Sequence, residues 1–192
     1  GPTPLFRKIA AEIRENGPIG LDRYMALCLG HPVHGYYRTR DPLGRGGDFV
    51  TAPEISLMFG ELIGVWIAAT HAAMGAPEKL TLVELGPGRG TLMADALRAA
   101  RIVPGFLEAA WVELVETSPR LETAQRRKLD GAARHIAWHH AIDDLPDGPA
   151  VIIANEFFDA LPVRHYVRGT AGWHERIVGL GDGGALVFGA AP

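Results

Sequence analysis

Apolar runs and amphipathic segments alternate through the middle of the chain, and this order predicts parallel strands connected by helices. Four runs are the expected strands: 80–85, 111–115, 135–139 and 150–154. Helical spacing of apolar residues is found between them at 91–100 and 118–130. The run at 150–154 is continuously apolar, as in a strand covered on both faces. The pattern therefore predicts an α/β fold built on a parallel sheet.

The two ends of the chain have other patterns. Helices are expected at 3–16, 22–29 and 55–74, the last one after the capping-box spacing of Thr51 and Glu54. That apolar helix is expected to lie in the core, with Gly60 and Gly64 allowing close packing. After residue 162, three short strands separated by glycine-rich turns are expected at 163–168, 173–180 and 185–188. Such a succession is typical of an antiparallel β-meander.

We therefore expect three segments in the chain. These are an N-terminal helical cap with a segment that covers a ligand (1–75), an α/β core (76–162) and a C-terminal β-meander insertion (163–192). A parallel sheet of this kind normally continues past its fourth strand, because its faces and edges need cover. We accordingly expect that the natural protein continues beyond the last residue given.

A glycine-dense turn follows the first expected strand, and the rest of the core is organised around it. Gly86, Gly88 and Gly90 allow a sharp turn and close approach of a ligand, and the next helix points its free N–H groups at that turn. The dinucleotide fingerprint requires a third glycine where Thr91 stands. The spacing, with Glu84 inside the strand, instead resembles motif I of the class I S-adenosylmethionine-dependent methyltransferases.

Acidic residues follow two of the expected strands at the same sheet edge. Glu116 ends the second strand, where a carboxylate beside the first loop can accept hydrogen bonds from both ribose hydroxyls. Nicotinamide-dependent enzymes use the same arrangement, so Glu116 favours an adenosine-type ligand without choosing between the two classes. Asp143 lies in the loop after the third strand, where an adenine amino group is expected.

A second polar group stands at the end of the fourth strand. Asn155, Glu156 and Asp159 follow the apolar run directly, which predicts that they lie in the ligand crevice. The spacing of Glu156 and Asp159 would put both on one side of a helical turn. These three residues are the expected catalytic group.

Composition excludes several classes of function. The chain has 192 residues and a formal net charge of −3, without the clustered basic residues that nucleic-acid binding requires. Cys28 is the single cysteine, so an internal disulfide is impossible. No apolar stretch of the sequence reaches the length of a membrane span. The histidines do not combine with cysteines or further histidines at ligand spacing, and we expect no metal site.

Several segments together resemble one family, the MidA family. They are 35–37, 47–56, 59–64, 84–93, 116–119 and 155–162. The resemblance implies a Rossmann-like class I methyltransferase with S-adenosyl-L-methionine as cofactor, and family members are longer than this chain. It also implies that the segment containing Asp48 and Thr51 covers the cofactor held by Glu84, the glycine turn and Glu116.

The eukaryotic members of that family act in respiratory complex I assembly as protein arginine methyltransferases. The resemblance thus implies a protein substrate, with a complex I subunit or its homologue as candidate. It implies the mitochondrial matrix for eukaryotic members and the bacterial cytoplasm otherwise. Two alternatives remain open: a catalytically silent assembly or binding protein on the same fold, and an NAD(P)-dependent oxidoreductase. The oligomeric state is not predicted.

Overall fold

The chain forms two compact units in a computed structural model that describes residues 1–39 and 52–191. One unit combines Gly1–Pro42 with Asp159–Pro192, and the other spans Leu43–Phe158. This grouping differs from the three segments expected from the sequence. The N-terminal helices divide between the units, and the meander shares a unit with the first of them.

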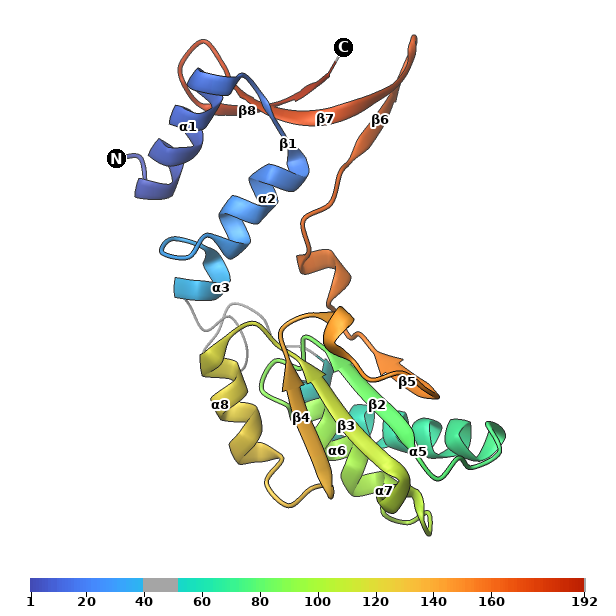
Figure 1. Cartoon of the computed structure of the whole chain (residues 1–192). Coiled ribbons are helices and arrows are strands. Elements are labelled where there is room, and N and C mark those ends of the chain that lie inside the picture. The colour runs from blue at the N-terminus through green and yellow to red at the C-terminus, as the bar shows by residue number, and fades with distance from the viewer. Residues whose placement is uncertain (40–51, 192) are drawn as a thin grey trace. The chain divides into compact units, whose positions relative to one another are not determined.

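The second unit contains the predicted parallel sheet, with strand order β4-β3-β2-β5 (Figure 1). Its strands are β2 (Leu80–Leu85), β3 (Ala110–Val115), β4 (His135–His139) and β5 (Ala150–Ile153). All three neighbouring pairs are parallel, and Leu82 lies opposite both Val112 and Val151. The predicted α/β class and strand positions are confirmed. The expectation that the strand at 150–154 is covered on both faces is wrong, because β5 ends the described sheet and Ile152 is half-exposed. Because the strands run in one direction, their carboxyl ends meet at one edge of the sheet.

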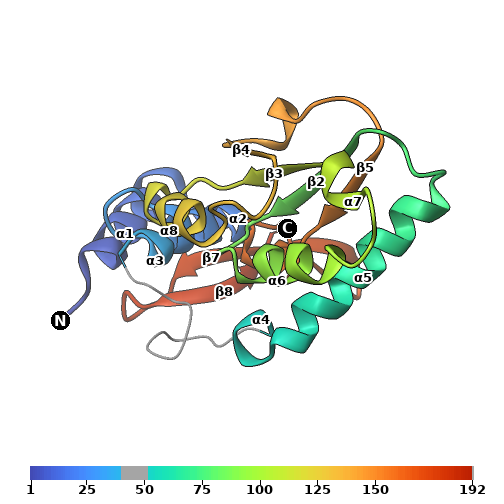
Figure 2. The same ribbon diagram turned by 90° about the horizontal axis from the view of Figure 1, so that it is seen from below.

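Helices α5 (Leu57–Ala73) and α6 (Thr91–Ala100) lie on the same side of this sheet (Figures 1 and 2). Two further helices, α7 (Phe106–Ala109) and α8 (Pro119–Lys128), complete this part of the unit. The main apolar core includes side chains from the sheet, α5, α6 and α7, among them Ile67, Leu80, Leu82, Met93, Leu97, Phe106 and Leu114. Ser118 caps α8 by accepting from Leu121 N, and Pro119 is the first residue of the helix.

The long helix expected at 55–74 is interrupted at its start. A short helix α4 (Ala52–Ile55) precedes Ser56, whose extended backbone ends it and whose hydroxyl caps α5 by accepting from Met58 N at 3.2 Å. The expectation of close packing at the two glycines is confirmed. A Cβ on Gly60 would lie 2.6 Å from Asp95 Cβ, and one on Gly64 would collide with the backbone of Ala96.

One face of α5 is exposed, which differs from the core helix expected. The buried face carries the two glycines, Ile67, Ala68 and His71. The exposed face carries large apolar side chains at helical spacing: Met58, Leu62, Val65 and Trp66. The apolar composition of α5 predicted that every face of the helix is buried. In the structure, only the face that carries the small residues packs on α6.

The first unit combines N-terminal helices with the C-terminal strands. It contains α1 (Pro4–Asn16), β1 (Ile19–Gly20), α2 (Leu21–Gly30), α3 (Tyr36–Thr39), η2 (Phe158–Ala160, which begins in the other unit), β6 (Tyr166–Gly169), β7 (Gly172–Leu180) and β8 (Leu186–Ala190). Strand β7 pairs antiparallel with β6 and with β8, which confirms the meander. Ile177 and Val178 of β7 also pair antiparallel with β1. Ile9, Ile13, Ile19, Leu27 and Val178 form its core.

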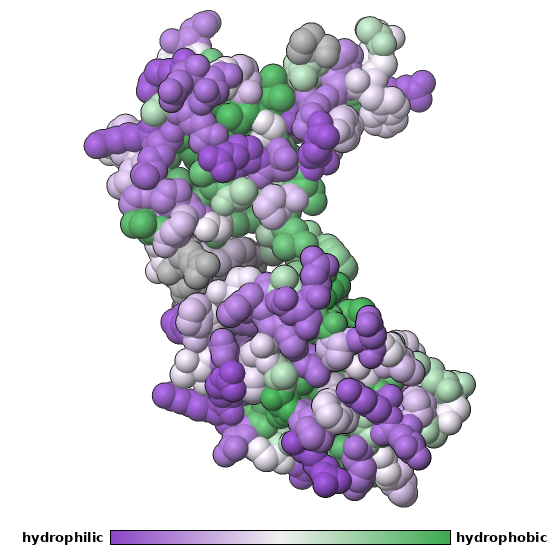
Figure 3. All heavy atoms as spheres, in the orientation of Figure 1, coloured by the Kyte–Doolittle hydropathy of each residue, from purple (hydrophilic) through white to green (hydrophobic). Residues whose placement is uncertain are grey.

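Polar residues dominate the surface of the chain that Figure 3 shows, with apolar residues scattered among them. Within the described ranges, no helix is long and apolar enough to cross a membrane.

Candidate functional site

The glycine turn between β2 and α6 adopts the conformation that its sequence predicts. Gly86, Gly88 and Gly90 have φ angles of 63°, 56° and 77°, in the left-handed region that disfavours side chains. Gly86 N donates to Val115 O at 3.0 Å, which ties the turn to β3. The ring of Phe157 lies against Gly86, where an added Cβ would be 2.6 Å from Phe157 Cδ2. The backbone of the turn is therefore fixed at the sheet edge and cannot accept larger residues without strain.

Glu84 lies at the end of β2, just before this turn, and is almost completely buried. Burial raises the pKa of its carboxyl group to about 8, although a hydrogen bond from the Met93 backbone N–H opposes that rise. Its Oε2 atom is buried and has no hydrogen-bond partner within the described chain. An unpartnered buried oxygen is costly, so it indicates a position suited to a donor from outside the chain.

Glu116 follows β3 at the same edge, as predicted, and is also buried. Its Oε1 accepts from Ser118 N at 2.8 Å, and its Oε2 accepts from Gln125 Nε2 at 3.1 Å. Burial raises the pKa of Glu116, and these hydrogen bonds oppose the rise. Each carboxylate oxygen can accept a second hydrogen bond, so both retain capacity for a ligand donor.

Gln125 on α8 connects Glu116 to the glycine turn, a role that was not predicted from the sequence. It is fully buried, and its Nε2 donates to Gly88 O at 2.7 Å as well as to Glu116. Its Oε1 accepts from Trp138 Nε1 at 2.9 Å. One sequence signal was present: Gln125 lies on the stripe of Leu121 and Leu129, which faces the core.

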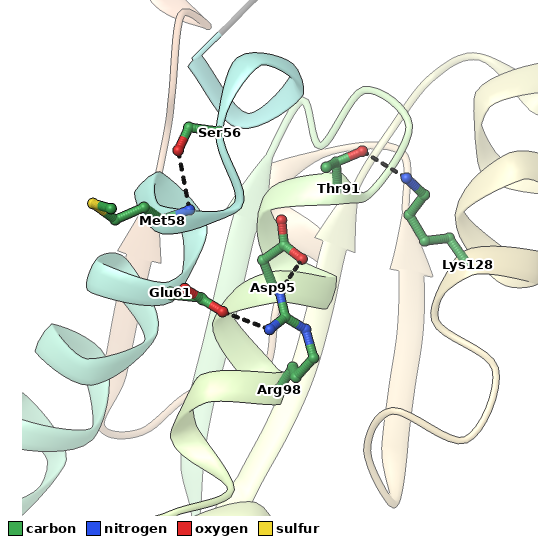
Figure 4. A network of polar contacts seen from close by, with 7 residues as sticks. All are labelled: Ser56, Met58, Glu61, Thr91, Asp95, Arg98 and Lys128. Atoms are coloured by element: carbon green, nitrogen blue, oxygen red, sulfur yellow. Dashed lines mark hydrogen bonds and ion pairs between the residues drawn. The ribbon is translucent and has the colours of Figure 1, made fainter.

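A second polar connection holds α4 to the first residue of α6. Thr91 Oγ1 donates to Glu54 Oε1 at 2.8 Å and accepts from Lys128 Nζ at 2.8 Å. Figure 4 shows Thr91 and Lys128 approaching each other from α6 and α8. Two turns further along α6, Arg98 forms ion pairs with Asp95 and with Glu61 of α5 (Figure 4). Glu54, which capping alone could explain in the sequence, thus has a partner beside the glycine turn.

The three residues expected to be catalytic do not share a helical turn. Asn155 and Glu156 lie in a turn after β5, and Glu156 has a φ of 48°, in the left-handed region. Asp159 lies in η2 and belongs to the first unit. The prediction that Glu156 and Asp159 share one helical turn is therefore wrong, because the left-handed residue interrupts any helix. Their catalytic role stays a prediction.

The remaining predicted cofactor contacts have no test in the structure. Asp143 lies in the 3-10 helix η1 (Ile142–Asp144), exposed, after β4 at the carboxyl edge of the sheet. Asp48 and Thr51 fall outside the described residues.

The histidines of β4 make contacts of other kinds. His139 Nε2 lies 2.7 Å from Glu113 Oε2, and the ring of His135 stacks on Trp111. Among residues 1–39 and 52–191, no group of three or more His, Cys, Asp or Glu side chains is placed to hold a metal ion.

Comparison with known proteins identifies the family. A family model described as putative S-adenosyl-L-methionine-dependent methyltransferase matches residues 62–192. The chain therefore belongs to this family of methyltransferases, in agreement with its resemblance to the MidA proteins.

Curated relatives are named protein arginine methyltransferase NDUFAF7, mitochondrial. The zebrafish (Danio rerio) protein is 40% identical over 197 residues, which cover 92% of this chain and 47% of that protein. The human (Homo sapiens) protein is 38% identical over 200 residues, which cover 93% of this chain and 45% of that protein. The chain thus spans about half the length of the curated relatives it matches.

Solved structures agree with this placement. A COG1565 superfamily protein from Burkholderia thailandensis, bound to S-adenosyl-homocysteine, has a TM-score of 0.82 and 33% identity. The likeness covers 100% of this chain and 52% of that one. The predicted class I methyltransferase fold is confirmed.

Proposed function

We propose that this protein binds S-adenosyl-L-methionine at the β2–α6 turn and transfers its methyl group to a protein arginine. The observation that carries the cofactor part is the left-handed glycine turn between two buried carboxylates, Glu84 with an unpartnered oxygen and Glu116 at the end of β3. The description of the family, and the S-adenosyl-homocysteine bound by the Burkholderia protein, support the same ligand.

The donors and acceptors of this edge fit the chemistry of such a cofactor. Its ammonium group is a donor for the free oxygen of Glu84, and the ribose hydroxyls are donors for the oxygens of Glu116. The glycine turn lets backbone approach the amino-acid end, because no Cβ intervenes. Asp143 is our candidate for the adenine amino group, since it follows the neighbouring strand at the same edge. When bound, the cofactor supplies an electrophilic methyl group.

The residues after β5 would hold the methyl acceptor. Transfer requires the attacking nitrogen in line with the methyl group at near-contact distance, so positioning is the protein's main contribution. An arginine nitrogen is a poor nucleophile while its guanidinium is protonated. A carboxylate that binds the guanidinium localises its charge away from the attacking nitrogen. Glu156 is our candidate for this role, with Asn155 orienting it.

Two observations support Glu156 as the carboxylate that binds the guanidinium. It follows β5 at the carboxyl edge of the sheet, and its backbone lies in the left-handed region, which costs energy for a residue with a side chain. Such strain is often retained at functional sites. Asp159 stays a candidate from the sequence.

The curated names of the relatives support a protein substrate. For a first test we propose arginine-containing subunits of respiratory complex I or their bacterial homologues, in keeping with the family resemblance. The relatives are named as mitochondrial. We propose the corresponding compartment for a eukaryotic source and the cytoplasm for a bacterial one.

The test is incubation with S-adenosyl-L-methionine and candidate protein substrates, followed by mass spectrometry of tryptic peptides. We expect a gain of one or more methyl groups on arginine, and at least a tenfold lower yield with Glu156→Gln, because a neutral amide binds guanidinium more weakly. Methylation of a residue other than arginine would refute the acceptor. Cofactor binding without any transfer would favour the alternative of a silent binding protein.

A further inference from the structure

Gln125 makes hydrogen bonds in three directions from a fully buried position. Its Nε2 donates to Gly88 O at 2.7 Å and to Glu116 Oε2 at 3.1 Å, and its Oε1 accepts from Trp138 Nε1 at 2.9 Å. An amide nitrogen has two protons, and both are used here. A glutamine this deep in the unit is uncommon, because burying an amide is favourable only when its groups are paired.

The orientation of this amide follows from its partners. Carbonyl and carboxylate oxygens only accept, and an indole N–H only donates, so the nitrogen must face Gly88 and Glu116 and the oxygen must face Trp138. A reversed amide would leave two acceptors facing an oxygen. The side chain is therefore held in one orientation by three elements of the same unit.

The two acceptors belong to different parts of the cofactor site proposed above. Gly88 lies in the turn that approaches the amino-acid end, and Glu116 is the acid proposed for the ribose. Gln125 also packs against Gly90, where an added Cβ would lie 3.4 Å from Gln125 Cγ. One side chain thus sets the spacing between the glycine turn and the ribose-binding carboxylate.

We propose that Gln125 is a positioning residue for S-adenosyl ligands, which acts through Glu116 and Gly88 and contacts no ligand itself. This inference rests on the proposed function. Gln125 holds one oxygen of Glu116 while Ser118 N holds the other, so the carboxylate cannot rotate about its terminal bond without losing a hydrogen bond. An ionised and fixed carboxylate is the better acceptor for a diol.

The ionisation of Glu116 offers a readout that simple loss of packing would not change. Burial raises the pKa of Glu116, and the hydrogen bond from Gln125 opposes that rise, so removal of the donor raises it further. The charged and titratable groups on the elements around Glu116 are Glu84 on β2, Glu113 on β3, His135 and His139 on β4, His140 just after β4, and Arg120, Glu122, Arg126, Arg127 and Lys128 on α8. All of them are retained in Gln125→Met.

The experiment measures the affinity for S-adenosyl-homocysteine by calorimetry from pH 5 to pH 8. Gln125→Met keeps the length of the side chain without its donors, and Arg127→Ala is a matched control because Arg127 is exposed on the same helix. We expect binding at least tenfold weaker for Gln125→Met at pH 7, with the acid limb of its profile displaced to higher pH. Arg127→Ala should stay within twofold of the unaltered protein.

A second comparison tests whether Gln125 acts through Glu116. In a Glu116→Gln background, Gln125→Met should weaken binding by a smaller factor than in the unaltered protein, because the carboxylate that it orients is already gone and only the hydrogen bond to Gly88 is left to lose. Equal losses in both backgrounds with an unmoved acid limb would overturn the proposal, as would unchanged affinity. Should Gln125→Met fail to fold, Trp138→Phe provides the same comparison, since it removes the donor that orients the amide and keeps an aromatic ring.

The two proposals fail in different ways. If the unaltered protein shows no binding, the proposed function fails and this inference falls with it. If the unaltered protein binds and Gln125→Met binds equally well at every pH, the inference alone is refuted.

Discussion

Thr91 Oγ1 donates a 2.8 Å hydrogen bond to Glu54 Oε1 across 37 positions of the sequence. The same hydroxyl accepts from Lys128 Nζ. It therefore joins α4 and α8 to the first residue of α6, directly after the glycine turn. Thr91 is also the residue that replaces the third glycine of the dinucleotide fingerprint. The same position therefore distinguishes this turn from a dinucleotide-binding turn and connects it to α4 and α8.

Replacement of the Thr91 hydroxyl tests this connection. Thr91→Val should lower the free energy of unfolding by about 1–2 kcal/mol, because Glu54 and Lys128 both lose a partner in a partly buried place. Thr123→Val is the matched control, since the Thr123 hydroxyl donates to the carbonyl of Pro119 in its own helix. Urea unfolding followed by tryptophan fluorescence provides the measurement. Equal losses for the two variants would mean that the connection contributes nothing.

The packing of α5 on α6 depends on the absence of a side chain at Gly64. In an open helix, glycine to alanine should stabilise by up to about 1 kcal/mol. At Gly64 the new Cβ would overlap the backbone of Ala96, which cannot move as a flexible side chain can. Gly64→Ala should therefore destabilise by about 2 kcal/mol or more.

Gly30→Ala is the control for this packing, because no atom of the described residues lies within 4 Å of a Cβ built at Gly30. Its melting temperature should be unchanged or slightly raised, whereas that of Gly64→Ala should fall by several degrees. A rise for Gly64→Ala would contradict the close contact of the two helices.

The buried carboxyl of Glu84 predicts a dependence of stability on pH. Its pKa is raised to about 8 in the folded protein by burial, against 4.5 for the exposed group. Between these values the folded state keeps the proton and the unfolded state has released it, so the free energy of unfolding falls as pH rises through that window and levels off above it. Glu84→Gln cannot ionise and should lack this contribution.

The measurement is urea unfolding of both proteins at several pH values from 4.5 to 9. The stability of the unaltered protein minus that of Glu84→Gln should decrease steadily up to about pH 8. A difference that is constant or rises with pH would show that Glu84 is ionised in the folded state.

The backbone of Glu156 is strained, and we expect that the strain is retained because the side chain is needed for methyl transfer. Glycine adopts its left-handed backbone readily, so Glu156→Gly should raise stability by up to about 1 kcal/mol while methyl transfer is lost. Ala76, with a φ of 50°, is the control: Ala76→Gly should give a similar gain and leave transfer intact. Thermal unfolding and the mass-spectrometric assay measure the two effects. Full transfer by Glu156→Gly would remove Glu156 from the proposed mechanism.

Periodicity predicted most regular elements, because apolar spacing and capping residues act locally. The strands of the parallel sheet, the turn at 86–90 and the helices that begin near residues 3 and 118 are examples. The strand β1 was not predicted, since two residues carry no detectable alternation and its partner β7 is distant in sequence. The interruption at Ser56 was hidden by apolar residues on both sides.

The site was predicted less completely, for a related reason. Glu84 and Glu116 could be placed because strand ends are visible in the sequence. Gln125 precedes a run of basic residues that resembles a solvated face, and its partner Gly88 lies 37 positions away. The left-handed backbone of Glu156 had no local signal at all, since glycine is the residue that usually marks it.

The most direct test of a cofactor site at the glycine turn is calorimetric titration of the protein and of Glu116→Ala with S-adenosyl-homocysteine. The account predicts saturable binding at one site in the unaltered protein and at least tenfold weaker binding in the variant, because the ribose hydroxyls lose their acceptor. No heat of binding with either protein would contradict it.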